Sequence, residues 1–397
     1  MKILPSSAWA LALTTSLACG GGAQEAGRSM VRSSDPQLGA LAETLVLDLA
    51  SRSGLELREP VRLEERSRDD LVRYLEAKLD EEMPEAEARS MVAAYGLLGL
   101  VPPDLDLRSV LLDLYTEQVA GFYDPDSTAL FILDDQPQLM LQGLLVHELV
   151  HAIQDQTADL AALTDPSLGN DRQSAAQAAI EGHATLVMLE YLSEMSGAAV
   201  DLGQVPDFAA RLRPALESMA QFPALAGAPR VIRESLLFPY LEGAGYVQRL
   251  WHEGEHTAPF GPYLPLSTEQ VLTGDRGDAP VSLSITGSGV VHSDDLGRFE
   301  TGIVLDTHLG GEAANLAEGW GGDRYALVET PAGEGLVWAS VWDEREARDR
   351  FASALEGALD SFPAVATLDS LDLDGRPGVI VRIGVPRGVE VAVSVVR

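Results

Sequence analysis

The sequence is poor in cysteine and in positive charge. Its 397 residues include a single cysteine, Cys19, and 28 lysines and arginines against 61 aspartates and glutamates. A lone cysteine cannot form an intramolecular disulfide, so no disulfide framework stabilises this chain. The formal net charge of −33 argues against nucleic acid as a partner, because phosphate binding requires clustered lysine and arginine side chains. Such an excess of acid is typical of a solvated negative surface.

Long apolar runs are also missing from the sequence. No segment approaches the roughly 20 apolar residues that a membrane-spanning helix requires. The N-terminal string MKILPSSAWALALTTSLACGGG has one lysine, then a short apolar run, then small residues. This order is typical of a secretory signal peptide, which we place at residues 1–18. The sequence therefore predicts an exported protein.

Cys19 stands at the end of this signal in the string Ser-Leu-Ala-Cys. The string resembles a bacterial lipobox, in which the cysteine is lipidated and becomes the first mature residue. Ser16 stands where a lipobox usually has leucine, and Ser16 with Ala18 also suits an ordinary signal peptidase, so simple secretion is the alternative. A leftover cysteine in an exported chain calls for a specific use, which favours lipidation. We predict a lipid anchor in the membrane of the cell envelope, followed by a flexible tether over residues 19–35.

The remaining chain has the composition of a folded protein, with 46% hydrophobic and 22% charged residues. Apolar residues at helical spacing predict several helices over residues 36–277. A short strand at 60–65 and a hairpin around the turn at 124–127 predict a small sheet near the start of this domain.

The pattern changes beyond about residue 278. Strand-like segments there surround an amphipathic helix at 344–362, and residues 377–396 indicate a hairpin that turns at Pro-Arg-Gly. The sequence therefore predicts an α+β fold. A mainly helical domain over 36–277 precedes a smaller α+β domain over 278–397.

One predicted helix carries polar residues inside an apolar run. The string LLVHELVHAIQDQ places His147, Glu148 and His151 among leucine, valine, alanine and isoleucine. Burying these groups without partners is costly, which argues against incidental surface residues. Residues four apart lie on the same face of a helix, so His147 and His151 can hold one metal ion. Glu148 points to the side of this pair and can reach a water on the metal.

A catalytic zinc site requires a third protein ligand. The pattern with a third histidine on the same segment would need glycine at Gln154 and histidine at Thr157, so the third ligand lies elsewhere. Glu181 stands 30 positions after His151 in the apolar string AAIEGHAT. The precedent of two histidines and one glutamate favours Glu181, and His183 is the alternative. Three protein ligands leave one position open, as catalytic sites require.

The motif HELVH with a glutamate on the next helix looks like the gluzincin branch of zinc metallopeptidases. The strings EQVAGFYDP, HELVHAIQDQ, EGHAT, FPYLEGAGYV, STEQVL and GWGGDRY together resemble a family of bacterial exported HExxH proteins of the peptidase MA-like kind. The resemblance extends from about residue 60 to about residue 350, and the catalytic core is its most specific part.

The resemblance implies a zincin-like core that binds Zn²⁺ through His147, His151 and Glu181. It also implies that Glu148 is the catalytic acid and base. The strand at Ala129–Leu133 would line the substrate cleft, where a peptide could add to the sheet edge as an extra strand.

Further residues are candidates for supporting roles in peptide hydrolysis. The oxyanion of the tetrahedral intermediate needs a donor besides the metal. Tyr240 is the first choice, with Tyr246 and His252 behind it. Metal-binding side chains are usually oriented by further hydrogen bonds. Asp155, one turn after His151, and Thr185, one turn after Glu181, are placed for this, although Asp155 could equally be a surface acid.

The sequence thus predicts a zinc-dependent endopeptidase of the bacterial cell envelope that acts on peptide or protein substrates. The alternative is a non-enzymatic envelope lipoprotein, a binding or assembly factor on a peptidase fold. The large C-terminal region without evident chemistry motivates this alternative. The presence of Glu148 argues against it, because a protein without catalysis has no need for that residue.

Overall fold

The structure is a computed structural model that describes residues 7–9, 29–198, 200–206, 208–217, 222–254, 256–386 and 388–396. Cys19 and the predicted signal peptide, apart from Ser7–Trp9, lie outside these residues. No helix in the described ranges has the length and apolar character needed to cross a membrane.

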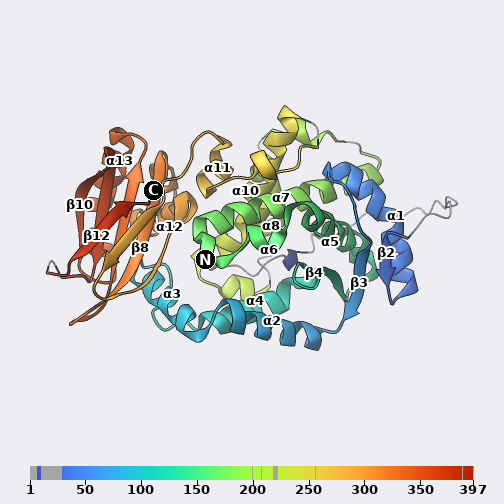
Figure 1. Cartoon of the computed structure of the whole chain (residues 1–397), viewed down its shortest axis with the longest axis horizontal. Helices are drawn as coiled ribbons and strands as arrows, with labels where there is room; N and C mark the ends of the chain where they lie inside the picture. The colour runs from blue at the N-terminus through green and yellow to red at the C-terminus, as the bar shows by residue number, and fades with distance from the viewer. Residues whose placement is uncertain are drawn as a thin grey trace.

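The N-terminal part of the chain is mainly helical and contains one small sheet (Figure 1). Its strands are β1 (Ser7–Trp9), β2 (Val31–Ser33), β3 (Val61–Arg66), β4 (Val119–Asp124) and β5 (Ala129–Leu133), in the order β1-β4-β5-β3-β2. Its helices are α1 (Pro36–Ser53), α2 (Arg68–Glu82), α3 (Glu85–Leu97), α4 (Leu107–Gln118), α5 (Gln138–Ala158), α6 (Leu160–Leu163), α7 (Asn170–Met195), α8 (Phe208–Glu217), α9 (Pro223–Gly227), α10 (Arg230–Glu253) and α11 (Thr268–Thr273). Strands β2, β3 and β5 are parallel, and β4 is antiparallel to β5.

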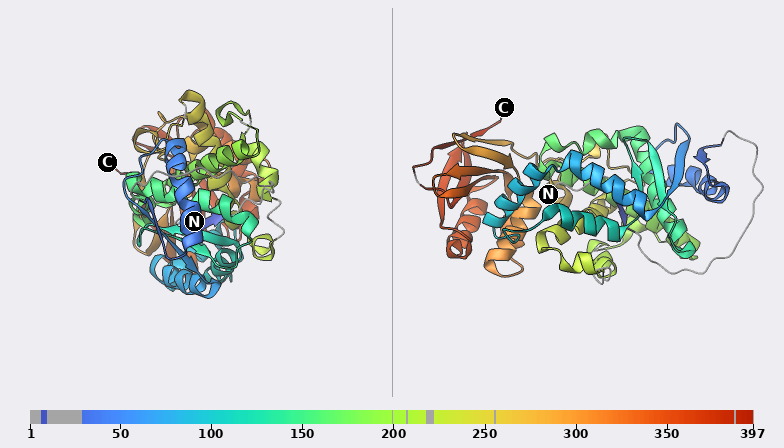
Figure 2. Two further views of the ribbon diagram at one scale, coloured as in Figure 1. Left: turned by 90° about the vertical axis from the view of Figure 1, so that its right-hand side faces the viewer. Right: turned by 90° about the horizontal axis from the view of Figure 1, so that it is seen from below.

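The C-terminal part is rich in strands and lies at the opposite end of the molecule from α1 and β2 (Figures 1 and 2). Its elements are β6 (Leu283–Gly287), β7 (Val290–Asp294), α12 (Gly297–Leu309), β8 (Trp320–Thr330), β9 (Gly333–Trp342), α13 (Arg345–Glu356), β10 (Ala366–Leu373), β11 (Arg376–Ile383) and β12 (Val391–Val395). An antiparallel sheet has the order β10-β11-β9-β8-β7, and β12 pairs with β6 separately. The predicted α+β class, with a helical part followed by a β-rich part, is confirmed.

Two helices, α5 and α7, form the centre of the helical part. Every residue from 144 to 154 on α5 and from 175 to 188 on α7 is buried. A helix that is apolar on all sides is stable only inside a core, which explains why these two helices lack a clear polar face. The polar residues that they do carry must therefore find partners inside the protein.

One hydrophobic core runs through both parts of the chain. Leu149 on α5 and Leu186 on α7 belong to the same buried cluster as Trp338 on β9 and Phe351 on α13. Helix α12, which the sequence reading did not predict, packs against α7, α10 and α11 and helps to join the parts. Its buried Glu300 accepts hydrogen bonds from the hydroxyls of Tyr95 and Ser235. The continuous core fixes the C-terminal sheet against the helices.

The predicted tether is wrong at its C-terminal end. Val31–Ser33 forms strand β2, which pairs in parallel with β3. The carboxylate of Glu43 on α1 accepts the backbone N–H groups of Met30 and Val31 at 2.9–3.1 Å. A partner 12 to 13 residues away therefore orders this segment, whose own composition is typical of a linker.

The predicted C-terminal hairpin is also wrong. Strand β11 pairs with β10 and β9, whereas β12 pairs with β6. The actual hairpin joins β10 to β11 through a turn at Asp374 and Gly375, both with positive φ. The sequence did not predict strand β10. None of its side chains is fully buried, and its sequence therefore lacks the continuous apolar run that indicates a buried strand.

Buried carboxylates lie where α7 meets the C-terminal part. Asp171, at the start of α7, accepts hydrogen bonds from the backbone N–H and the hydroxyl of Thr268 at 2.9 and 2.5 Å. Asp323 on β8 accepts the backbone N–H groups of Leu296 and Gly297 at 3.1 and 2.9 Å. These hydrogen bonds satisfy the carboxylates and fix the first turn of α12 near α7.

Asp171 is expected to make stability depend on pH. Burial raises its pKa to about 7, and the negative charges of Asp323 and Glu300 add to the rise, although the hydrogen bonds from Thr268 oppose it. A pKa that is higher in the folded than in the unfolded chain stabilises the fold at low pH, and this contribution disappears as the pH rises through about 7. The free energy of unfolding should fall by roughly 3 kcal/mol between pH 5 and 8 from this group.

The variant Asp171→Asn should flatten that pH profile, because asparagine keeps an oxygen acceptor for Thr268 and does not titrate. Urea unfolding of both proteins at several pH values measures the difference. Parallel profiles for the wild type and the variant would contradict this assignment.

Candidate metal centre

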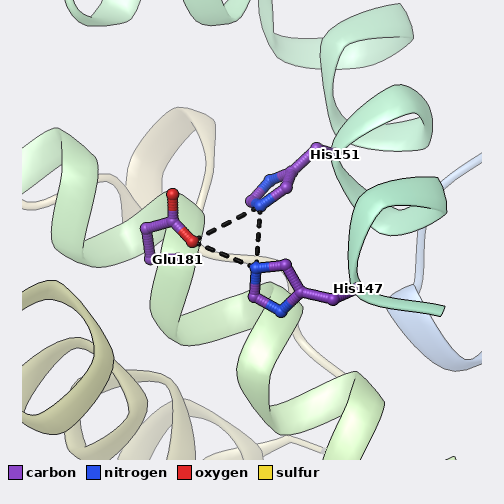
Figure 3. Close-up of side chains that lie close together, drawn as sticks. All are labelled: His147, His151 and Glu181. Carbon is purple, nitrogen blue, oxygen red and sulfur yellow. Dashed lines mark hydrogen bonds and ion pairs between the residues drawn. The ribbon is translucent and has the colours of Figure 1, made fainter. Parts of the chain in front are cut away.

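Three buried side chains converge between α5 and α7 (Figure 3). His147 and His151 lie one turn apart on α5, and their Nε2 atoms are 3.0 Å from each other. Oε2 of Glu181 on α7 is 3.2 Å from Nε2 of His147 and 3.4 Å from Nε2 of His151. All three residues are at most 1% exposed. The structure thus brings together the two histidines and the glutamate that the sequence predicted.

These distances fit a single tetrahedral ion. Zinc binds histidine nitrogen at 2.0–2.1 Å, so two corners of its coordination tetrahedron are about 3.3–3.4 Å apart. The three separations of 3.0–3.4 Å are close to that value. At these distances, the lone pairs of the two imidazole nitrogens and of the carboxylate oxygen would repel one another unless a cation or a proton lies between them. The donor set therefore fits Zn²⁺ with little rearrangement.

Gln154 determines which nitrogen of His151 carries a proton. The amide nitrogen of Gln154 donates to the carbonyl oxygen of Ile180 at 3.0 Å, which fixes the orientation of the amide. The amide oxygen must then accept a hydrogen bond, and it does so from Nδ1 of His151 at 2.8 Å. In the neutral form of His151, the lone pair is therefore on Nε2, which faces His147 and Glu181. A metal ligand requires this tautomer.

The charges within the cluster also favour a cation. Burial alone would lower the pKa of His151, but the adjacent Glu181 carboxylate outweighs it and raises that pKa to about 9. Burial would raise the pKa of Glu181, but the neighbouring histidines lower it to about 2. The other carboxylate oxygen of Glu181 accepts a hydrogen bond from Gln177 at 3.0 Å. The site therefore keeps an ionised carboxylate and stabilises positive charge beside it.

Glu148 lies next to the cluster and is fully buried. Among the described residues, no other side chain forms a hydrogen bond with its carboxylate oxygens, and the backbone N–H of Tyr123 is the donor that acts on its pKa. Burial raises its pKa to about 8, with an added contribution from Glu181, although positive charge on His151 opposes this. A buried carboxyl group with a raised pKa is suited to take up and release a proton near neutral pH.

Tyr240 on α10 lies on the other side of the site. Its ring stacks near that of His147, with 6.3 Å between ring centroids. Burial raises the pKa of Tyr240 well above its usual value, and the charges of Glu181 and Glu148 and a hydrogen bond to Glu181 raise it further. The hydroxyl group therefore stays protonated at neutral pH and remains a hydrogen-bond donor next to the metal ligands.

Close contact between α7 and α10 brings Tyr240 to Glu181. A Cβ atom on Gly182 would lie 2.1 Å from the carbonyl carbon of Gly243, and one on Gly243 would lie 2.2 Å from the carbonyl oxygen of Ala178. No real Cβ atom tolerates such distances to backbone. Both positions therefore require glycine, because only glycine allows the two helix backbones to touch.

Other candidate residues have partners outside the cluster. The hydroxyl of Tyr246 donates to the carbonyl oxygen of Tyr263 at 2.5 Å. Nδ1 of the exposed His252 is 3.2 Å from the carbonyl oxygen of Gly203. Tyr240 is thus the one of the three oxyanion candidates that reaches the cluster.

The residues that orient the ligands also differ from the prediction. Asp155 does not orient His151: its carboxylate accepts hydrogen bonds from the hydroxyl of Tyr123 at 2.8 Å and from the backbone N–H of Leu160 at 2.9 Å. His183, the alternative ligand, accepts a hydrogen bond from the Gln154 amide at 3.0 Å. Burial lowers its pKa to about 3, so it is neutral. The orienting role of Gln154 was not predicted, and its position three residues after His151 is the sequence feature that could have indicated it.

The predicted edge strand is wrong. Strand β5 (Ala129–Leu133) lies between β4 and β3, so both of its edges are paired. The next strand on this side is β4, whose other edge pairs with Ser7–Trp9, the antiparallel strand β1 at the edge of the sheet. The sequence could not distinguish the two strands of the β4-β5 hairpin, because β3 reaches β5 from more than 60 residues away.

Removing the amide of Gln154 is expected to weaken metal binding. In Gln154→Leu, His151 loses the acceptor for its Nδ1 proton, and loss of such a partner typically costs 10–100-fold in metal affinity. Gln154→Glu keeps an acceptor for Nδ1 of His151 but loses the donor to the carbonyl oxygen of Ile180, so it should bind metal more tightly than Gln154→Leu. Competition titrations with a zinc-sensitive dye compare the three proteins. Equal affinity in Gln154→Leu and the wild type would show that the hydrogen bond does not orient the ligand.

Comparison with known proteins gives information on the C-terminal part alone. Residues 285–396 match a family described as a domain of unknown function (DUF8575). This match begins within β6 and ends after β12, so it leaves out α5, α7 and α10. No curated protein and no solved structure matches the chain.

Proposed function

We propose that this protein is a zinc-dependent endopeptidase that is exported and tethered to the bacterial cell envelope. The observation that carries the proposal is the buried convergence of His147, His151 and Glu181, with Glu148 beside them and bound by no other side chain. Two histidines and a glutamate form the ligand set of catalytic zinc sites that keep one position for water. A structural zinc site would not need a free carboxyl group next to the ligands.

The residues around the site would have different roles in peptide hydrolysis. Zinc, when bound by His147, His151 and Glu181, would lower the pKa of water and polarise the carbonyl group of the substrate. Glu148 would accept the proton of the attacking water and then donate it to the leaving amine. Tyr240, which stays protonated, would donate a hydrogen bond to the oxygen that becomes negative in the transition state.

A peptide substrate is supported by the edge of the small sheet. Residues Ser7–Trp9 pair with β4 as an extended antiparallel strand, with Ser7 opposite Phe122 and Trp9 opposite Val119. The same short strand contacts α5, the helix that carries both histidines. The edge of β4 can thus accept extended polypeptide along α5, and main-chain hydrogen bonds of this kind recognise a peptide with little dependence on sequence.

The proposal is tested by metal analysis and peptide cleavage with the same protein. The full-length chain should bind one zinc ion per molecule and cut members of a broad peptide library at internal bonds. A chelator should abolish cleavage, and added zinc should restore it. A protein that binds zinc but cuts no peptide would favour the alternative, a non-enzymatic binding or assembly factor.

A further inference from the structure

A second group of acidic side chains lies at the junction of the two parts of the chain, away from the candidate metal centre. Glu269 is on α11, Asp278 is in the connection between α11 and β6, and Asp343 follows β9. Their carboxylate oxygens lie within 4.8 Å of one another. The three residues come from segments of the chain that are up to 74 positions apart, and only the tertiary fold brings them together.

Glu269 distinguishes this group from an ordinary acidic surface. The residue is only 5% exposed, and its carboxylate faces Asp278 and Asp343, with no side-chain hydrogen bond or ion pair found for it among the described residues. The positive charge of Arg298 acts on Glu269 and partly offsets the two neighbouring carboxylates. A buried carboxylate that faces two other carboxylates without a partner requires a compensating positive charge.

The raised pKa values of the three carboxyl groups agree with a site for a cation. Burial raises the pKa of Glu269 to about 8, and the charges of Asp278 and Asp343 add to the rise. Burial likewise raises the pKa of Asp278 and of Asp343. Each carboxylate is therefore less stable as an anion in this arrangement than it would be in water.

We propose that Glu269, Asp278 and Asp343 bind a calcium ion that ties the C-terminal part of the chain to the helical part. One carboxylate oxygen from each residue lies within 4.8 Å of the other two, so a single ion can contact all three. Calcium takes six to eight oxygen ligands in flexible geometry, whereas magnesium requires a near-ideal octahedron and keeps several of its waters. Three carboxylates from three separate segments therefore favour calcium, and water would complete its coordination.

The site also has a structural connection to α7. Thr268, which precedes Glu269 on α11, donates two hydrogen bonds to Asp171 in the first turn of α7. Calcium at Glu269 would therefore fix α11 between α7 and the C-terminal sheet. Two of the three ligands are partly or fully exposed, so we expect a dissociation constant of about 10⁻⁴–10⁻³ M, the range of extracellular calcium modules.

The experiment uses the full-length chain, first freed of metals and then supplied with one equivalent of zinc. Calorimetric titration with Ca²⁺ should show one site, and Ca²⁺ should raise the thermal unfolding temperature. Glu269→Gln should lower the calcium affinity at least tenfold. Asp343→Asn should do the same, and because Asp343 is exposed this substitution leaves folding intact. Glu346→Gln, which removes an exposed charge on α13, is the matched control and should bind calcium like the wild type.

Two results would overturn the calcium site. One is the absence of saturable Ca²⁺ binding in the wild type up to 10 mM, the other an affinity that is unchanged in both Glu269→Gln and Asp343→Asn. Magnesium binding as tight as calcium binding would refute the choice of ion. Activity is not the readout here, so the calcium site can fail or succeed independently of the proposed peptidase function.

Discussion

Replacing Glu148 with glutamine is expected to abolish peptide cleavage and to leave zinc binding intact. Glutamine has nearly the same shape but cannot accept a proton, and general base catalysis typically contributes 10²–10⁴-fold to a rate. We therefore expect kcat/KM to fall by about 10³-fold or more. Because Glu148 is not one of the converging ligands, the zinc content should stay at one ion per chain. Peptide cleavage assays and metal analysis on the same preparations measure both quantities.

The control for this variant is Glu76→Gln on the exposed face of α2, which should change neither cleavage nor zinc content. Stability provides an additional check. Burial raises the pKa of Glu148 to about 8, so its contribution to stability is lost as the pH rises through that value. In the metal-free protein, Glu148→Gln should thus unfold no more easily than the wild type at pH 9. Full cleavage activity in Glu148→Gln would refute its role as the base.

Replacing Gly182 with alanine is expected to damage both stability and activity. The new methyl group would lie 2.1 Å from the backbone of Gly243, and a backbone atom cannot rotate away as a side chain can. The helices α7 and α10 would have to separate, and overpacking of this kind costs about 1–3 kcal/mol or more in the free energy of unfolding. Because Glu181 precedes Gly182 and Tyr240 lies on α10, a shift of about 1 Å should lower kcat/KM roughly 100-fold.

Gly143→Ala is the matched control for this prediction. Gly143 lies on α5, and the nearest atom that its Cβ would meet is Cδ1 of Leu192 at 3.9 Å. This substitution should stabilise the helix by about 0.5–1 kcal/mol and leave cleavage unchanged. Thermal or urea unfolding together with cleavage rates distinguishes the two variants. If Gly182→Ala behaved like Gly143→Ala, the close helix contact would not be what positions Tyr240.

Local patterns in the sequence were sufficient to predict the three side chains that converge between α5 and α7. His147 and His151 share a helix face because helical geometry relates residues four apart, whatever the rest of the chain does. Glu181 could be predicted because an unpartnered acid in an apolar helix requires a partner, and the pair of histidines supplies one. The helical and β-rich parts of the α+β fold followed from hydrophobic periodicity for the same reason, since periodicity depends on near neighbours.

Contacts between distant segments decided the rest, and such contacts leave little trace in local periodicity. The tautomer of His151 depends on Ile180, 26 residues after Gln154. The choice of Tyr240 over Tyr246 depends on where α10 touches α7.

The same limit applies to the sheets. Strand β5 lies inside its sheet because β3 pairs with it. Strand β12 pairs with β6 and not with β11, which precedes it in the sequence. The sequence of a strand shows which side chains lie on each face of the sheet. It does not show which strand lies alongside, because backbone hydrogen bonds between strands are the same whatever the side chains are. The sequence alone therefore determined which residues could bind a metal ion, and the tertiary structure decided which neighbours orient those residues and which sheet edge lies beside them.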